Sequence, residues 1–169
     1  MLGPRIALGI AVRVFALGTM SACSLVLDFD QATDAAPPDS PATEVQCAFG
    51  EPNELAAMAH VWPLADVDAA ICGMGDLDYY KLTILDGQTI TARITFMNRG
   101  GSGDLDLRLL SADGGTVYDE SRGATDTEEV LCPGGVPCPA LVAGDYLVEV
   151  RGFAPAVISP YLLQITLGP

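Results

Sequence analysis

Hydrophobic and polar residues alternate along much of this chain, which is the pattern of half-buried β-strands. In residues 103–109 (GDLDLRL) three leucines alternate with Asp104, Asp106 and Arg108. Successive side chains of a strand point to opposite faces, so this segment is expected to bury its leucines and to leave the three charged side chains in solvent. Such a strand needs a second apolar face against its leucines, which indicates a layered β-structure.

The same alternation recurs at short intervals, and Asp86-Gly87 between two of these segments is typical of a hairpin turn. Asn53 is a candidate N-cap for one or two helical turns in the alanine-rich stretch that follows it. No long stretch has a 3.6-residue period. The sequence therefore predicts an all-β single domain, an antiparallel β-sandwich or jelly roll. The further expected strands are residues 78–85, 88–97, 116–119, 145–151 and 161–167.

The chain before this domain divides into two parts. Residues 1–22 have the layout of a secretory signal peptide, with an apolar stretch that ends in small residues. Met20-Ser21-Ala22 before Cys23 resembles the bacterial lipobox, whose cysteine is lipidated and anchors the protein to a membrane of the cell envelope. Ordinary cleavage and secretion is the alternative. Residues 23–46 lack a periodic apolar face and are predicted to be a disordered tether, which leaves residues 47–169 for the folded domain.

Four cysteines lie in the predicted domain, and an even number in an exported protein indicates disulfides. Three pairings are possible. The short spacing of Cys132 and Cys138 favours a local bridge, which leaves Cys47 with Cys72. A zinc site is the alternative, but no Cys-x2-Cys spacing is present and His60 is the only histidine.

The charge balance excludes one class of partner. The chain has 22 acidic and 8 basic residues, a formal charge of −14. Without residues 1–22, which contain two arginines, 22 acidic residues face 6 basic ones, and the charge is −16. Such a surface repels nucleic acid and attracts cations, so nucleic-acid binding is not expected. Solubility alone explains the acidity equally well.

Six short blocks of sequence follow one another along the predicted domain. They are Glu51-Pro52-Asn53-Glu54, GDLDYY at 75–80, GQTIT at 87–91, GDLDLRL at 103–109, GDYLVEV at 144–150 and Pro160-Tyr161. In this order they resemble the bacterial pre-peptidase C-terminal domain, a β-sandwich found beside secreted peptidases and in envelope proteins. The resemblance covers about residues 47–168. Some members of that family bind collagen, and some hold calcium near the N-terminal edge of the domain.

The resemblance implies a calcium site, because residues 51–54 match family positions that supply oxygen ligands. Asp76 and Asp78 stand two residues apart before a predicted strand, so they would point the same way in extended chain. Calcium binds six to eight oxygen atoms, and these side chains supply them if the two segments meet. Capping of turns and strand ends is the alternative role for such acids. The predicted calcium ligands are Glu51, Asn53, Glu54, Asp76 and Asp78, with Asp66 and Asp68 as further candidates.

The sequence favours a binding protein over an enzyme. His60 is the only candidate histidine base, and no Gly-x-Ser-x-Gly, His-Glu-x-x-His or phosphate-loop pattern is present. We therefore expect a non-catalytic domain that binds an envelope protein or a polymer. The alternative is an accessory or targeting partner of a secreted peptidase, and nothing indicates an oligomeric state. The candidates for an aromatic binding surface are Tyr79, Tyr118, Phe153 and Tyr161, of which alternation assigns Tyr161 to the core.

Overall fold

The computed structural model of the 169-residue chain describes residues 41–134 and 138–169. The predicted signal peptide, Cys23 and the tether up to residue 40 lie outside these residues. Within them, no helix is long and apolar enough to cross a membrane. The elements are α1 (Glu44–Cys47), the 3-10 helix η1 (Ala56–Met58), β1 (His60–Val61), β2 (Val67–Cys72), β3 (Leu77–Ile84), β4 (Thr89–Phe96), the 3-10 helix η2 (Arg99–Gly101), β5 (Leu105–Ser111), β6 (Val117–Ser121), β7 (Thr127–Cys132), β8 (Gly144–Gly152) and β9 (Ile158–Gly168).

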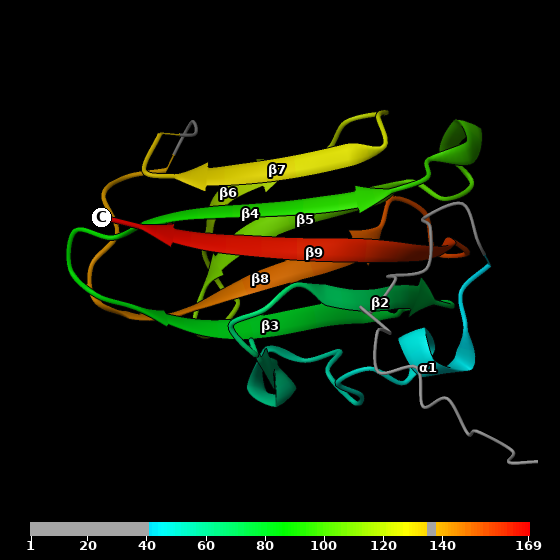
Figure 1. The fold of residues 1–169 in the computed structure, drawn as a ribbon, viewed down its shortest axis with the longest axis horizontal. Coiled ribbons are helices and arrows are strands. Elements are labelled where there is room, and N and C mark those ends of the chain that lie inside the picture. Colours follow the sequence, from blue (N-terminus) through cyan, green and yellow to red (C-terminus); the bar gives the residue numbers. More distant parts are fainter. Residues whose placement is uncertain (1–40, 135–137) are drawn as a thin grey trace, which may run out of the picture. The chain divides into compact units, whose positions relative to one another are not determined.

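The strands form two sheets that lie face to face (Figure 1). The five-stranded sheet has the order β1-β3-β8-β5-β6, and the four-stranded sheet has the order β2-β9-β4-β7. All neighbouring strands are antiparallel except β1, which runs parallel to β3. The predicted antiparallel β-sandwich is therefore confirmed.

The core lies between the two sheets and consists of the apolar positions that alternation assigns to one face of each strand. Leu105, Leu107 and Leu109 of β5 are all fully buried, and so is Leu163 of β9 in the opposite sheet. Tyr161, the predicted core aromatic of β9, is 1% exposed. Each sheet thus supplies the apolar cover that the strands of the other need.

The predicted hairpin at Asp86-Gly87 is wrong. A turn is present, since the Gln88 N–H donates a hydrogen bond of 3.1 Å to the Leu85 carbonyl. However, β3 pairs with β8 in one sheet, and β4 pairs with β7 and β9 in the other. The turn therefore carries the chain from one layer to the next. A turn sequence specifies reversal of the chain but not hydrogen bonding between its flanking strands, and both strands are apolar on the face that packs into the core.

The solvated face predicted for β5 is also wrong, because Asp104 is 7% exposed and Asp106 only 2%. β5 lies between β8 and β6, so side chains of both neighbours cover its outer face. Asn98 Nδ2 donates a hydrogen bond of 2.8 Å to Asp104, and Arg151 Nη2 donates one of 3.1 Å to Asp106. Burial is tolerated here because each carboxylate has a donor.

Two details of the N-terminal region differ from the expectation. Residues 44–46, assigned to the tether, belong to α1, which begins with a capping box between Thr43 and Gln46. The Gln46 side chain is 4% exposed and donates a hydrogen bond of 2.6 Å to Asp68 of β2. Asn53 is not an N-cap, because the N-cap of η1 is Leu55 and Asn53 is fully buried. Packing against the sandwich thus orders a segment whose composition alone resembles a linker.

Candidate metal centre

Two disulfides hold segments of the domain together. Cys47 at the end of α1 is bonded to Cys72 at the end of β2, with their Cα atoms 5.6 Å apart. Cys132 at the end of β7 is bonded to Cys138, with a Cα separation of 5.5 Å. This is the pairing that the sequence spacing favours. The first bridge fixes the start of residues 43–54, which we call the strap, to the sandwich.

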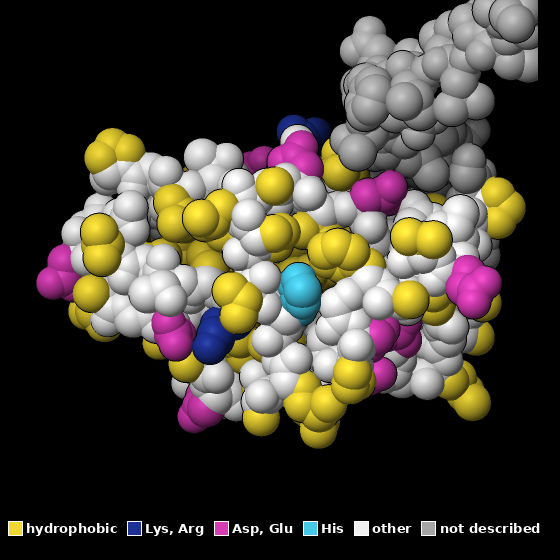
Figure 2. Space-filling view, turned by 60° about the horizontal axis from the view of Figure 1, so that its bottom comes forward, with side chains coloured by type: hydrophobic (Ala, Val, Ile, Leu, Met, Phe, Trp, Pro, Cys, Tyr) yellow, Lys and Arg dark blue, Asp and Glu magenta, His cyan; other side chains and the backbone are white. Residues whose placement is uncertain are grey.

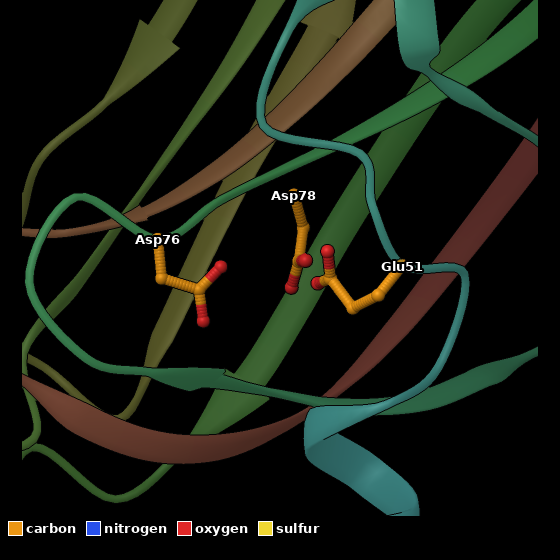
Figure 3. Close-up of side chains that lie close together, drawn as sticks. All are labelled: Glu51, Asp76 and Asp78. Carbon is orange, nitrogen blue, oxygen red and sulfur yellow. The ribbon is translucent and has the colours of Figure 1, made fainter.

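Three carboxylates meet where the strap passes the start of β3 (Figure 3). Glu51 comes from the strap, Asp76 from the loop before β3, and Asp78 from β3 itself. One oxygen of each lies within 4.8 Å of one oxygen of each of the others. Two segments far apart in sequence thus bring three negative charges to one point.

Asp78 is the most buried member of the cluster, at 1% exposure. It occupies the core-facing side of β3, where the Tyr161 hydroxyl of β9 donates a hydrogen bond to it. The Tyr161 hydroxyl also lies 2.7 Å from that of Tyr80. Burial raises the pKa of Asp78 to about 7, with Asp76 and Glu51 adding repulsion, while Tyr161 and Asn53 act in the opposite direction. The surroundings of Asp78 therefore destabilise its ionised form relative to its protonated form.

The pKa values of the other two carboxylates, Glu51 and Asp76, are also raised. Burial raises the pKa of Glu51 and of Asp76, and repulsion among the acids of the site contributes to both shifts. Each carboxylate also accepts a backbone hydrogen bond, Glu51 from Asn53 at 3.1 Å and Asp76 from Cys72. No Lys or Arg of the described chain forms an ion pair with any of the three. Their repulsion is therefore not balanced by the protein itself.

Besides the three clustered carboxylates, the site contains a buried amide, the side chain of Asn53. Its side chain is fully buried, yet neither Oδ1 nor Nδ2 has a hydrogen-bond partner within residues 41–134 and 138–169. It lies close enough to Asp78 to lower the pKa of that carboxyl, but the two side chains do not form a hydrogen bond of standard geometry. A buried amide without a partner destabilises a fold by about 1–3 kcal/mol. A bound ion or an ordered water is the usual partner of such a group.

The cluster opens onto a hollow of about 650 Å³ between the strap and the loop from Cys72 to Asp76. Glu54 lines this hollow but does not join the three clustered carboxylates. The structure thus brings three of the five predicted ligands together, places Asn53 beside them and leaves Glu54 at the rim. The further candidates lie elsewhere: Asp66 accepts a hydrogen bond from Gln164, and Asp68 accepts one from Gln46.

The donor set suits a hard divalent cation. Carboxylate oxygens and an amide oxygen are the ligands that calcium takes, in sets of six to eight that are commonly completed by backbone oxygens and water. Glu51, Asp76, Asp78 and Asn53 fit this chemistry. A zinc site is not supported, because the cysteines that border the hollow, Cys47 and Cys72, are bonded to each other.

Sequence reasoning missed the two tyrosines of the site. Alternation assigns Tyr161 only to the core, although Tyr161 contacts Asp78 across 83 residues of sequence. One signal was available: Asp78 and Tyr80 are two residues apart in β3, so they share a face, and that face is the buried one. Alternation therefore indicates an inward carboxylate, but not which strand of the other sheet lies opposite.

The predicted aromatic surface is not assembled in the described chain. Tyr161 lies in the core, Tyr79 is half-buried, and Tyr118 packs against Tyr146 with ring centroids 5.4 Å apart. Only Phe153 of the four candidates is largely exposed, at 65%. These four rings therefore do not form a row on which a polymer could stack.

Apolar side chains gather instead on the side of the molecule that Figure 2 brings forward. Yellow hydrophobic groups form a broken patch there, with magenta acidic groups at its margins. The exposed large apolar side chains among residues 55–64 are Leu55, Met58, Val61 and Leu64. The segment that follows the strap thus carries apolar groups in solvent.

Comparison with known proteins gives similarity at the level of structure. No family model matches the sequence, and no curated protein matches it. Among solved structures, the chain is similar to the pre-peptidase C-terminal domain of collagenase from Bacillus anthracis. That match has 12% identity and a TM-score of 0.46, and it covers 60% of this chain and 88% of the other. A pre-peptidase C-terminal domain is thus among the solved structures that this chain resembles, as the sequence blocks predict.

A second similar structure is PliG of Aeromonas hydrophila, a periplasmic inhibitor of g-type lysozyme. It has 19% identity and a TM-score of 0.43, over 61% of this chain and 84% of the other.

Proposed function

We propose that this chain is an exported, non-catalytic β-sandwich of the bacterial cell envelope, in which a calcium ion ties the strap to β3. The observation that carries the proposal is the cluster of Glu51, Asp76 and Asp78 beside the buried, unpartnered amide of Asn53. Three carboxylates without a basic partner repel one another, and a divalent cation converts that repulsion into attraction.

Export is supported by the two disulfides. Disulfides persist in the periplasm or outside the cell, whereas the bacterial cytosol keeps thiols reduced. The lipobox-like sequence before Cys23 supports a lipid anchor at the mature N-terminus. The test is the mass of the mature protein from membranes: Cys23 with attached acyl chains is expected, together with release of the Cys23→Ser variant from the membrane fraction. Cleavage that leaves an unmodified Cys23 would remove the anchor from the proposal.

Calcium binding is tested by titration calorimetry and by thermal unfolding in calcium, in magnesium and in chelator. A ligand at a concentration of one hundred times its Kd stabilises the folded state by about 2.7 kcal/mol. We expect a stabilisation of this size in calcium, a smaller one in magnesium, and none in the Asp78→Asn variant. Asp145→Asn, an exposed carboxylate at the start of β8, is the matched control and should keep the full response. A melting temperature that ignores both calcium and chelator would overturn the calcium site.

The absence of catalysis is argued from access. A glycosidase uses a carboxylic acid of raised pKa together with an ionised carboxylate, but Asp78 is 1% exposed and accepts a hydrogen bond from Tyr161. A substrate would have to displace the strap to reach it. We expect no turnover of cell-wall glycans or peptides, and turnover that disappears in Glu51→Gln would contradict this part of the proposal.

The partner of such a module is an envelope protein or a polymer. The experiment is capture from solubilised envelopes with the immobilised protein, in calcium and then in chelator, with Asp78→Asn as the control. A defined partner that is lost both in chelator and in the variant is expected. A secreted peptidase as the captured partner would favour the accessory role. Identical capture with and without calcium would show that partner binding does not depend on the cation.

A further inference from the structure

The Cys47–Cys72 disulfide stands at the base of the proposed metal centre. Both cysteines line the same hollow as Glu51 and Asp76. Cys47 precedes Glu51 by four residues, and Cys72 precedes Asp76 by four. The bridge therefore joins the two segments that carry the carboxylates, at equal distances along the chain from each.

Hydrogen bonds hold the chain on both sides of the bridge, and the one on the β2 side reaches the site itself. The backbone N–H of Cys72 donates a hydrogen bond to the Asp76 carboxylate, so the end of β2 also orients a ligand. On the strap side, the Gln46 side chain, one residue before Cys47, donates a hydrogen bond to Asp68 of β2. The disulfide and these hydrogen bonds thus fix the strap to β2 four residues before Glu51. They thereby restrict where the Glu51 side chain can lie relative to β3.

Without a cation, the disulfide holds the strap close to β3 although their carboxylates repel each other. Asp76 raises the pKa of Glu51, and both raise that of Asp78, so the strap and β3 repel each other when all three are charged. A strap freed from Cys72 can move away and relieve the repulsion. Cation binding would then have to order the strap against β3 again. The free-energy cost of that ordering lowers the affinity for the cation.

We propose that the Cys47–Cys72 disulfide positions the two halves of the metal centre, so that cation binding and the oxidised bridge stabilise each other. This inference rests on the proposed calcium site. Reduction by a dithiol transfers two electrons: the sulfur–sulfur bond breaks, Cys47 and Cys72 become thiols, and the dithiol becomes a disulfide. Reduction then weakens calcium binding, and by linkage calcium makes the bridge harder to reduce by the same factor.

Couplings of this kind are commonly 5- to 150-fold, and we expect about tenfold here. For a two-electron couple, tenfold corresponds to a shift of about 30 mV in reduction potential. The Cys132–Cys138 bridge is an internal control. Cys132 of β7 lies opposite Ile90, near the start of β4. Tyr161, which contacts Asp78 of the cluster, lies opposite Phe96 at the end of β4. The Cys132–Cys138 bridge and the metal centre with its own bridge therefore lie at opposite ends of the sandwich.

The first measurement is the calcium Kd of the purified oxidised protein and of two double variants, by titration calorimetry. The Cys47→Ser/Cys72→Ser protein is expected to bind about ten times more weakly. The Cys132→Ser/Cys138→Ser protein also loses a disulfide but should keep the original Kd, which separates positioning of the site from general stability. Equal affinity in both variants would overturn the inference. Failure of the unaltered protein to bind calcium would instead overturn the proposed function.

The second measurement keeps all cysteines and does not depend on folding of a variant. The oxidised protein is equilibrated with mixtures of reduced and oxidised dithiothreitol, in calcium or in chelator, and each bridge is followed by alkylation and mass spectrometry. Calcium is expected to shift the midpoint of Cys47–Cys72 by about 30 mV to more reducing conditions, without a shift for Cys132–Cys138. An unchanged midpoint for Cys47–Cys72 in a protein that binds calcium would overturn the coupling.

Discussion

Two clusters of fully or partly buried acids in this protein differ in whether an arginine lies beside them. On the outer face of the five-stranded sheet, Asp106 and Glu149 are 2% and 4% exposed. Arg151 forms ion pairs with both, and Arg108 forms a second one with Glu149. At the strap, Glu51, Asp76 and Asp78 have no such partner in the described chain.

The difference shows how burial of a carboxylate should be interpreted. Where the fold supplies the positive charge, the acids are held by ion pairs within the structure. Where the fold supplies only other acids and an unpartnered amide, we propose that a bound cation supplies the positive charge. The following predictions test this distinction, from the largest expected effect to the smallest.

The first prediction removes the charge from the balanced cluster. Arg151→Met leaves Asp106 buried without its ion-pair partner, and we expect unfolding to become easier by about 4 kcal/mol, whether calcium or chelator is present. Denaturation in urea measures the free energy. The control is Arg122→Met, which removes the exposed ion pair with Glu120 and should change stability little. A calcium-dependent loss in Arg151→Met would show that the two clusters are not independent.

The second prediction concerns pH in chelator. Asp78 has a pKa of about 7 in the folded protein and of 3.8 as its ordinary value, so between these values the folded state binds more protons than the unfolded one. Stability present at low pH is then lost as pH rises toward 7. The free energy of unfolding should fall by about 3 kcal/mol from pH 5 to pH 8.

Calcium should reverse this trend, because it binds the deprotonated carboxylates and therefore stabilises more at pH 8 than at pH 5. Urea denaturation at a series of pH values measures both slopes. In Asp78→Asn the slope in chelator should largely disappear. Stability in chelator that rises between pH 5 and pH 8 would contradict the direction given for Asp78.

The third prediction tests the tyrosine beneath the site. Tyr161→Phe removes a hydrogen bond that lowers the pKa of Asp78, so we expect that pKa to rise and calcium to bind more weakly at pH 7. The loss in stability should be about 1.5 kcal/mol. Tyr146→Phe is the matched control, because its hydroxyl bonds only to the backbone of Val142. It should lose stability without a change in calcium Kd, and equal Kd values in both variants would contradict the role of Tyr161.

The fourth prediction uses two buried asparagines. Asn53→Leu replaces an amide that has no partner, so in chelator we expect stability to rise by about 1 kcal/mol while calcium affinity falls. Asn98→Leu is the control, since this amide donates to Asp104 and accepts from the Gly101 N–H. It should destabilise the protein in either condition. A stability loss in Asn53→Leu that matches Asn98→Leu would show that Asn53 serves the fold and not a ligand.

Several of these features were within reach of the sequence. Alternation locates the buried faces of β3, β4, β5, β8 and β9, because the two-residue repeat of a strand is a local property of the chain. The six-residue separation of Cys132 and Cys138 likewise makes their pairing a local matter. Three of the predicted ligands, Glu51, Asp76 and Asp78, also lie together in the carboxylate cluster, with Asn53 beside them.

Other features were decided only by tertiary packing. The placement of β3 and β4 in different sheets, the burial of Asp106 by β8 and β6, and the contact from Tyr161 to Asp78 all depend on segments distant in sequence. Local pattern records which face of a strand is apolar, but not which strand lies beside or opposite it. Alone, the sequence determined the strands, their inner faces and a set of candidate ligands. Tertiary structure decided which acids received an arginine and which were left together, because that depends on distances between segments that only the packed sandwich brings into contact.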